Sequence, residues 1–253
     1  MKKSGVLFLV VIMVASACSA TKANQPDAID VKESHHGEVH WSYSGETSPA
    51  HWAELSEDFQ TCATGQLQSP VDVSDAMAKT ENGIELNYSK TGTSVINNGH
   101  TLQVALTDEA QTMTVEGESF RLLQFHFHTP SENALNGKRF PMEAHFVHQD
   151  GKGNLAVLAV FMEEGEANAS LQRIWDLAPA TKSTSAAATE FNPKLLLPGD
   201  LEYFTFSGSL TTPPCSEGVH WRVLKTPIQV SKAQIEFFQS LYPINARPLQ
   251  SRD

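Results

Sequence analysis

Two histidines separated by one residue stand in the segment 124–128, which reads Gln-Phe-His-Phe-His. Side chains alternate between the two faces of a β-strand, so a strand here places His126 and His128 on one face and Phe125 and Phe127 on the other. The aromatic face would be buried, and the two imidazoles on the other face would then need polar partners or a ligand. Two histidines at this spacing can bind one metal ion, although a lone pair of this kind is more often an ordinary polar feature.

A third histidine lies in the segment 143–148, Glu-Ala-His-Phe-Val-His, which alternates in the same way. Glu143, His145 and Val147 would share one face. If the two strands pair, His145 completes a set of three imidazoles. Three nitrogen ligands with a fourth position open are typical of a catalytic zinc, whereas structural zinc sites are closed and usually contain cysteines. The sequence therefore predicts a zinc centre with a catalytic role.

The elements that must position these histidines are mostly short strands separated by turns. Strands are predicted at 82–87, 93–96, 102–106, 155–161, 203–206 and 219–224. Helices are predicted at 49–59 with proline at the first position, around 171–175, and at 231–241, where Ser231 and Gln234 form a capping box. Residues 181–189 are small and polar and predict a loop. No internal repeat or linker divides the chain, so we expect one mainly β domain.

The balance of charged residues limits the classes of partner that the protein is expected to bind. The 253 residues include 29 acidic and 18 basic side chains, a formal net charge of -11. Binding to phosphate backbones or to anionic membrane surfaces needs clusters of basic residues, so we expect no nucleic-acid partner.

The first 17 residues predict a secretory signal. Lys2 and Lys3 precede an apolar run at 6–14, and the small residues 15–17 form a cleavage pattern. The run is far shorter than the about 20 residues that span a bilayer, so no transmembrane helix is expected. Cys18 follows directly, which resembles a bacterial lipoprotein box, and lipid anchoring at Cys18 and plain cleavage both stay open. In either case the expected location is the cell envelope or periplasm, with residues 18–38 as a flexible lead.

Four motifs in this order resemble the α-class carbonic anhydrases. They are the segments 124–128, 131–132 (Ser-Glu), 143–145 and 209–214 (Ser-Leu-Thr-Thr-Pro-Pro). The similarity extends from about residue 39 to residue 250. It implies a catalytic domain at 39–251 with a large, twisted, mostly antiparallel central sheet, a few short peripheral helices and Zn²⁺ at the bottom of a conical cleft. The implied function is the reversible hydration of carbon dioxide to bicarbonate and a proton. The resemblance also implies cis peptide bonds before Pro70 and Pro214.

The resemblance assigns catalytic roles to three residues outside the zinc ligands. His100, in the turn 97–101, takes the position of the family's proton-shuttling histidine. Thr211 and Glu132 match the relay that orients the attacking hydroxide, and without the resemblance both would be taken for surface polar residues.

Supporting roles follow in the same way. Gln124 is expected to orient His126, Glu143 to orient His145, and the backbone of Asn245 to orient His128. The substrate, which is small and apolar, is expected to meet a wall of matching residues: Val147, Val157, Leu210, Thr211, Thr212 and Trp221.

The cysteine count supports export. An odd cysteine in an exported protein needs an explanation, and Cys18 supplies it by leaving with the signal or by carrying lipid. Cys62 and Cys215 are then left with each other in a compartment where disulfides persist, and bacterial members of the class carry a bridge at matching positions.

Two other functions are weighed against the enzyme. A catalytically weak relative could serve as a zinc-containing binding module, but such relatives usually lack a ligand and all three histidines are present. A zinc hydrolase acting on esters or peptides is the second, and the absence of a His-Glu-x-x-His helix and the apolar wall both speak against peptides.

Overall fold

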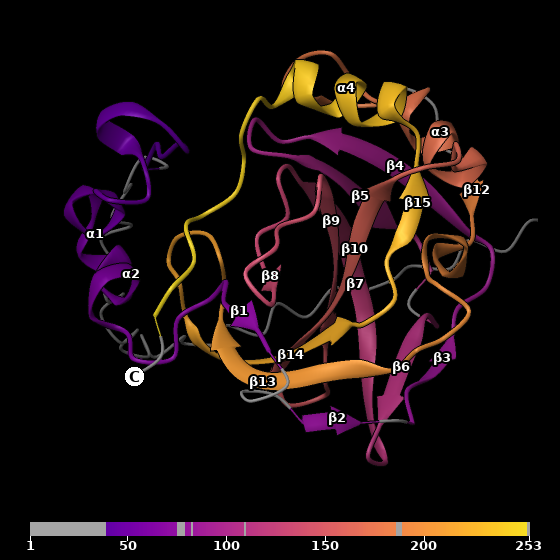
Figure 1. The fold of residues 1–253 in the computed structure, drawn as a ribbon, viewed down its shortest axis with the longest axis horizontal. Coiled ribbons are helices and arrows are strands. Elements are labelled where there is room, and N and C mark those ends of the chain that lie inside the picture. The colour runs from indigo at the N-terminus through magenta and orange to yellow at the C-terminus, as the bar shows by residue number, and fades with distance from the viewer. Residues whose placement is uncertain (1–38, 75–78, 82, 109, 186–188, 252–253) are drawn as a thin grey trace, which may run out of the picture. The chain divides into compact units, whose positions relative to one another are not determined.

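The computed structural model describes residues 39–74, 79–81, 83–108, 110–185 and 189–251 (Figure 1). The predicted signal at 1–17, the cysteine at position 18 and the lead that ends at 38 lie outside these residues. Among the residues described, no helix is both long and apolar enough to cross a membrane.

Short strands make up most of the fold, and the helices are few. The helical segments are η1 (Gly45–Thr47), α1 (Trp52–Leu55), η2 (Glu57–Phe59), α2 (Thr61–Thr64), α3 (Ala169–Trp175), η3 (Pro193–Leu196) and α4 (Lys232–Leu241). The first eight strands are β1 (Asp72–Val73), β2 (Lys79–Glu81), β3 (Glu85–Asn87), β4 (Thr91–Asn97), β5 (Leu102–Leu106), β6 (Thr112–Val115), β7 (Glu118–His128) and β8 (Ala134–Leu135). The others are β9 (Met142–Gln149), β10 (Leu155–Glu164), β11 (Ser183–Thr184), β12 (Thr189–Phe191), β13 (Tyr203–Ser209), β14 (Glu217–Leu224) and β15 (Ile228–Val230).

One large sheet organises the domain. Its main path runs β11-β4-β5-β7-β9-β10-β14-β13-β2, and the longest strands, β7 and β10, lie on either side of β9. Neighbours on this path are antiparallel except β10 and β14, and β10 also pairs with β15 in parallel. The predicted mainly β fold with a mostly antiparallel sheet is therefore confirmed, with a parallel pair near its middle.

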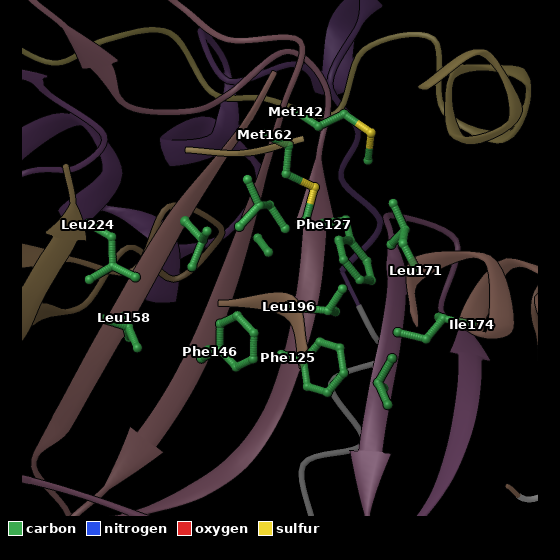
Figure 2. Packing of buried hydrophobic residues seen from close by; sticks show 14 of the residues in the cluster. Phe125, Phe127, Met142, Phe146, Leu158, Met162, Leu171, Ile174, Leu196 and Leu224 are labelled. Carbon is green, nitrogen blue, oxygen red and sulfur yellow. The ribbon is translucent and has the colours of Figure 1, made fainter. Parts of the chain in front are cut away.

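The main hydrophobic core lies on the aromatic face of β7 (Figure 2). Phe125 and Phe127 are fully buried there, and Phe125 stacks on Phe146 of β9 at 5.0 Å between ring centroids. The two longer helices cover this face, since Trp175 of α3 and Phe238 of α4 both contact the Phe127 ring. Removing one such ring would cost about 3–5 kcal/mol of the free energy of unfolding. This packing fixes β7, and with it the opposite, polar face of the strand.

A second, smaller apolar cluster lies on the histidine side of the sheet. It includes Val147 of β9, Val157 and Phe161 of β10, and Trp221 of β14. The sheet is thus buried on both faces, and the histidines emerge beside apolar side chains.

The helix predictions are partly confirmed. Helix α4 begins after Ser231, whose side chain and that of Gln234 form the predicted capping box, and residues 171–175 lie in α3. The helix predicted at 49–59 is wrong, because the chain makes one α-helical turn and then a separate 3-10 turn. Ser56 separates the turns in an extended conformation (φ −158°), and its hydroxyl oxygen accepts a hydrogen bond from the backbone of Asp58.

The loop predicted at 181–189 is also wrong in part, since β11 and the start of β12 pair with β4. The backbone of this segment finds its hydrogen-bond partners in the sheet, which its small polar side chains do not reveal.

Two covalent expectations are confirmed. Cys62 and Cys215, which are 153 positions apart in the sequence, form a disulfide. The peptide bonds before Pro70 and Pro214 are cis, and so is the bond before Pro130, which was not predicted.

Candidate metal centre

The register between β7 and β9 brings the three predicted histidines together. His126 lies opposite His145 in this antiparallel pair, and His128 is two positions further on the same face of β7. One ligand atom from each ring lies within 4.8 Å of the others, and no further group of three or more such residues occurs in the described part of the chain. The conditional expectation that the strands pair and complete a three-histidine set is confirmed.

The first two rings are oriented through the same nitrogen. Nδ1 of His126 donates to Oε1 of Gln124 at 2.9 Å, and Nδ1 of His128 donates to the backbone carbonyl of Asn245 at 2.7 Å. A proton on Nδ1 leaves Nε2 of each neutral ring with a free lone pair. Both partners are those expected from the sequence.

His145 is oriented the other way round. Its Nε2 lies 3.2 Å from Oε1 of Glu143, in ion-pair contact but not aligned as a hydrogen bond, so Nδ1 is the nitrogen left for the cluster. Glu143 is itself buried, and Asn133 donates to its two oxygens from the backbone and from the side-chain amide, both at 2.8 Å. Burial raises the pKa of Glu143, and these hydrogen bonds oppose that rise. Sequence reasoning missed Asn133, which follows Glu132 directly.

The donor set fits zinc. Burial lowers the pKa of all three imidazoles, to about 4 for His128, so they are neutral at pH 7, as metal ligands must be. Nε2 of His128 is buried and has no hydrogen-bond partner, which costs free energy unless something else binds it. Three neutral imidazole nitrogens suit Zn²⁺.

A buried carboxylate lies next to the histidines. Glu132 is fully buried, and its Oε2 lies 3.5 Å from Nε2 of His128. Its Oε1 accepts a hydrogen bond from the backbone N–H of Arg247 at 2.8 Å. Burial raises the pKa of Glu132 to about 8, even with the opposing effect of hydrogen bonds from Arg247 and from the Thr211 side chain. Arg247 gave no signal in the sequence, because nothing marks which distant backbone N–H will reach a buried carboxylate.

An apolar cavity of about 120 Å³ opens beside the cluster. Its lining contains all six predicted wall residues and three polar residues of the site: Val147, Val157, Leu210, Thr211, Thr212, Trp221, Gln124, His126 and His145. Thr211 is buried, so the structure brings both presumed surface polar residues, Thr211 and Glu132, into the interior.

A second cavity of about 150 Å³ connects His126 and His128 with His100. Its lining residues are Trp41, Tyr43, Asn98, His100, Thr101, Gln103, Gln124, His126, His128 and Thr212. The Trp41 ring stacks on the His100 ring, with 3.7 Å between centroids and 9° between planes. The structure therefore places His100 in the same cavity as two ligands, and it adds Trp41 and Gln103, which the sequence analysis did not single out.

The other described histidines stay outside the cluster. His40, His51 and His220 are exposed, and His148 is buried on the opposite face of β9.

The fold and the site define a class of zinc enzyme, and comparisons with known proteins agree. The family model for eukaryotic-type carbonic anhydrase matches residues 47–251. The chain therefore belongs to this family, whose members use zinc to hydrate carbon dioxide.

Bacterial relatives are the more specific match. A carbonic anhydrase of Neisseria gonorrhoeae is 45% identical over 217 residues, covering 85% of this chain and 86% of that protein. One from Klebsiella pneumoniae is 46% identical, covering 83% and 87%. The solved structure of α-carbonic anhydrase from Thermovibrio ammonificans, in complex with the inhibitor sulfanilamide, has 41% identity and a TM-score of 0.82, covering 86% of this chain and 97% of that one.

Proposed function

We propose that this carbonic anhydrase hydrates carbon dioxide reversibly at a zinc ion held by His126, His128 and His145. The observation that carries the proposal is the convergence of three neutral imidazoles beside an apolar cavity. Zinc in such a site supplies hydroxide at neutral pH, which is an established property of carbonic anhydrases and is not inferred from this structure. The alternative of a catalytically weak binding module has no support, because all three ligands and the wall are present.

The partners of the ligands set ring orientation. Gln124 and the Asn245 carbonyl hold a proton on Nδ1 of His126 and His128, and Glu143 faces Nε2 of His145. Such contacts fix the tautomer and raise the basicity of the ligating nitrogen.

The apolar wall binds the substrate. Carbon dioxide is linear and carries no net charge, so it is held by contact with Val147, Val157, Leu210 and Trp221 and not by a charged clamp. Thr212 lines both cavities, so it contacts the space beside the apolar wall and the space that contains His100.

Thr211 and Glu132 orient the attacking group toward the substrate. The Thr211 hydroxyl donates its hydrogen to Glu132, which the Arg247 N–H also holds as an acceptor. The Thr211 oxygen can then only accept a hydrogen bond, so it binds the hydrogen of an attacking hydroxyl group and leaves that group's lone pair directed at the substrate. A bound cation beside Glu132 favours its charged form.

His100 moves the proton released in each turnover. Histidine side chains in general titrate near pH 6.5, so an imidazole is the side chain suited to accept a proton inside the cleft and release it to buffer at neutral pH. The residue shares a cavity with two ligands without belonging to the ligand cluster, which suits a relay through water.

Export is supported by the disulfide and by the bacterial relatives. We infer residues 1–17 as the signal, 39–251 as the catalytic domain, and the periplasm as the location. Lipid anchoring would be tested by detergent partition of the full chain beside Cys18→Ser: loss of the detergent-phase protein in the variant supports an anchor, and identical partition refutes it.

One assay tests the function. Stopped-flow measurement of carbon dioxide hydration should show activity that a strong chelator removes and added zinc restores. Activity that survives complete removal of zinc would contradict the proposal.

A further inference from the structure

The segment 242–247, which follows α4, reaches back to the turn that carries His100. The hydroxyl of Tyr242 lies 2.6 Å from Oδ1 of Asn97 and 3.0 Å from the carbonyl oxygen of Thr101, and both atoms accept its hydrogen. These two residues bracket the turn 97–101 in the sequence. One side chain from the C-terminal segment thus holds both ends of the turn.

Asn245 adds a second tie, through its side chain. Its Nδ2 donates to the carbonyl of His100 at 3.0 Å and to that of Phe127 at 2.9 Å, while its Oδ1 accepts from the N–H of Thr129 at 2.7 Å. Phe127 and Thr129 flank the ligand His128. The amide therefore joins the backbone of His100 to the strand that carries the zinc ligands.

Contacts within the turn set its shape but not its place beside the site. Oδ1 of Asn98 accepts from the N–H groups of His100 and Thr101, both at 2.9 Å, and Gly99 adopts φ +91°, which favours glycine. The Thr101 hydroxyl makes one further tie to the Phe127 carbonyl. Pairing of β4 with β5 and of β5 with β7 holds the two ends of the turn in the sheet. The hydrogen bonds from Tyr242 and Asn245 add a tie from the C-terminal segment to the turn itself.

We propose that Tyr242 is a positioning residue for proton transfer, acting with Asn245 by fixing the backbone on which the His100 ring stands against Trp41. The inference rests on the proposed role of His100. Tyr242 lines neither cavity, and its hydrogen bonds among the described residues go to Asn97 and Thr101, so its influence passes through the turn. Proton transfer along bridging waters depends steeply on the placement of the two ends, and a small shift of the turn changes that placement.

The test is Tyr242→Phe in the zinc-loaded enzyme. The substitution removes one hydroxyl and keeps the ring that packs on Phe238. We expect kcat in dilute buffer to fall about 3- to 10-fold while kcat/KM for carbon dioxide stays unchanged, because only the proton-transfer step is affected. Imidazole at high concentration should restore kcat by bypassing the turn.

A matched control is Tyr88→Phe, which removes a buried tyrosine hydroxyl that bonds a side chain of the core, His148, on the far face of the sheet. It should lower stability by a similar amount and leave kcat, kcat/KM and zinc content unchanged. A fall in kcat in both variants would show a general effect of destabilisation and overturn the proposal.

Hydrogen exchange gives a readout that does not depend on turnover. Amide protons of His100 and Thr101 should exchange faster in Tyr242→Phe than in the unmodified enzyme and in Tyr88→Phe. Unchanged exchange at these two amides would refute the positioning role even if kcat fell.

His100→Ala separates this inference from the proposed function. Its kcat in dilute buffer should fall about 100-fold, and Tyr242→Phe added to it should have no further effect. An unchanged kcat in His100→Ala refutes the shuttle and the positioning role together. A slow His100→Ala with a fully active Tyr242→Phe refutes positioning alone.

Discussion

Strand β9 carries two buried histidines three residues apart, and only one of them belongs to the metal centre. Three is an odd number of residues along a strand, so His145 and His148 point to opposite faces of the sheet. Each is about equally removed from solvent, and burial lowers the pKa of both imidazoles. Burial alone therefore does not distinguish them.

The difference lies in what their nitrogens contact. Both nitrogens of His148 have partners, since Nδ1 contacts the Ala156 carbonyl and Nε2 the Tyr88 hydroxyl. His145 has one nitrogen against Glu143 and the other directed at two further imidazoles. A buried histidine that keeps one nitrogen available can bind a metal ion, whereas one with both nitrogens hydrogen-bonded stabilises the fold.

The largest expected effect is loss of the metal. Alanine at any one of His126, His128 or His145 should abolish hydration and most zinc binding, because two nitrogens hold the ion poorly. His148→Gln is the matched control and should keep zinc at full occupancy in its folded fraction. Elemental analysis of purified protein measures both. Full zinc occupancy in two of the three ligand variants would contradict the assignment of these histidines as ligands.

The partners of the ligands should matter less. Gln124→Ala and Glu143→Ala should each lower zinc affinity or activity about 10- to 100-fold, the usual effect of removing such a contact. Glu143→Gln keeps an acceptor for His145 and should lose less than Glu143→Ala. Competition with a fluorescent chelator gives the affinities. Equal affinity in all three variants and the unmodified protein would show that the observed contacts do not orient the rings.

Acid stability should depend on the far-face histidine. Burial and the nearby charge of Arg222 together lower the pKa of His148 to about 3, and its backbone hydrogen bonds oppose this shift. The unfolded state then binds an extra proton between pH 6.5 and 3, so this contribution to stability is complete above pH 6.5 and is lost as the pH falls. His148→Gln removes the titrating group.

The size of this effect on the free energy of unfolding follows from the linkage between proton binding and folding. Between pH 6.5 and 5 the free energy of unfolding should fall by about 2 kcal/mol more in the unmodified protein than in His148→Gln. Urea unfolding at the two pH values measures this difference. Identical pH dependence would mean that the pKa of His148 is the same in the folded and unfolded protein.

The smallest effect concerns Arg222, which is buried beside His148. Its Nε and Nη1 have no hydrogen-bond partner among the described residues, and its guanidinium lies over the Phe120 ring at 6.0 Å. Unsatisfied polar atoms here serve no metal, unlike those of the zinc face. Arg222→Met should therefore raise the free energy of unfolding by about 1 kcal/mol. A loss of more than about that amount in urea unfolding would reveal a partner for the guanidinium.

Alternation along single strands made the ligand face predictable. It placed His126, His128, Gln124 and Glu143 correctly, because side-chain parity is a local property. The pairing of β7 with β9 could not be predicted from either strand alone and was stated as a condition, because the register depends on both segments at once.

Burial of polar residues was not predictable in the same way. In the interior Glu132 accepts a hydrogen bond from the N–H of the distant Arg247, and Tyr242, just after α4, reaches the His100 turn from far along the sequence. No local pattern marks either contact. The helix predicted at 49–59 failed for a related reason, as tertiary contacts such as the bond from Trp52 to the Ser42 carbonyl override local propensity.

Under the proposed export, the disulfide has a consequence for the order of events during translocation. Cys215 emerges 153 positions after Cys62, so Cys62 waits as a thiol while most of the domain crosses the membrane. The other cysteine already across at that stage is Cys18, which makes it a competitor for Cys62. Under the same proposal, removal or lipidation of Cys18 would protect the correct pairing. Peptide maps without reduction should show a Cys18–Cys62 bridge in precursor whose processing is blocked, and its absence would rule the competition out.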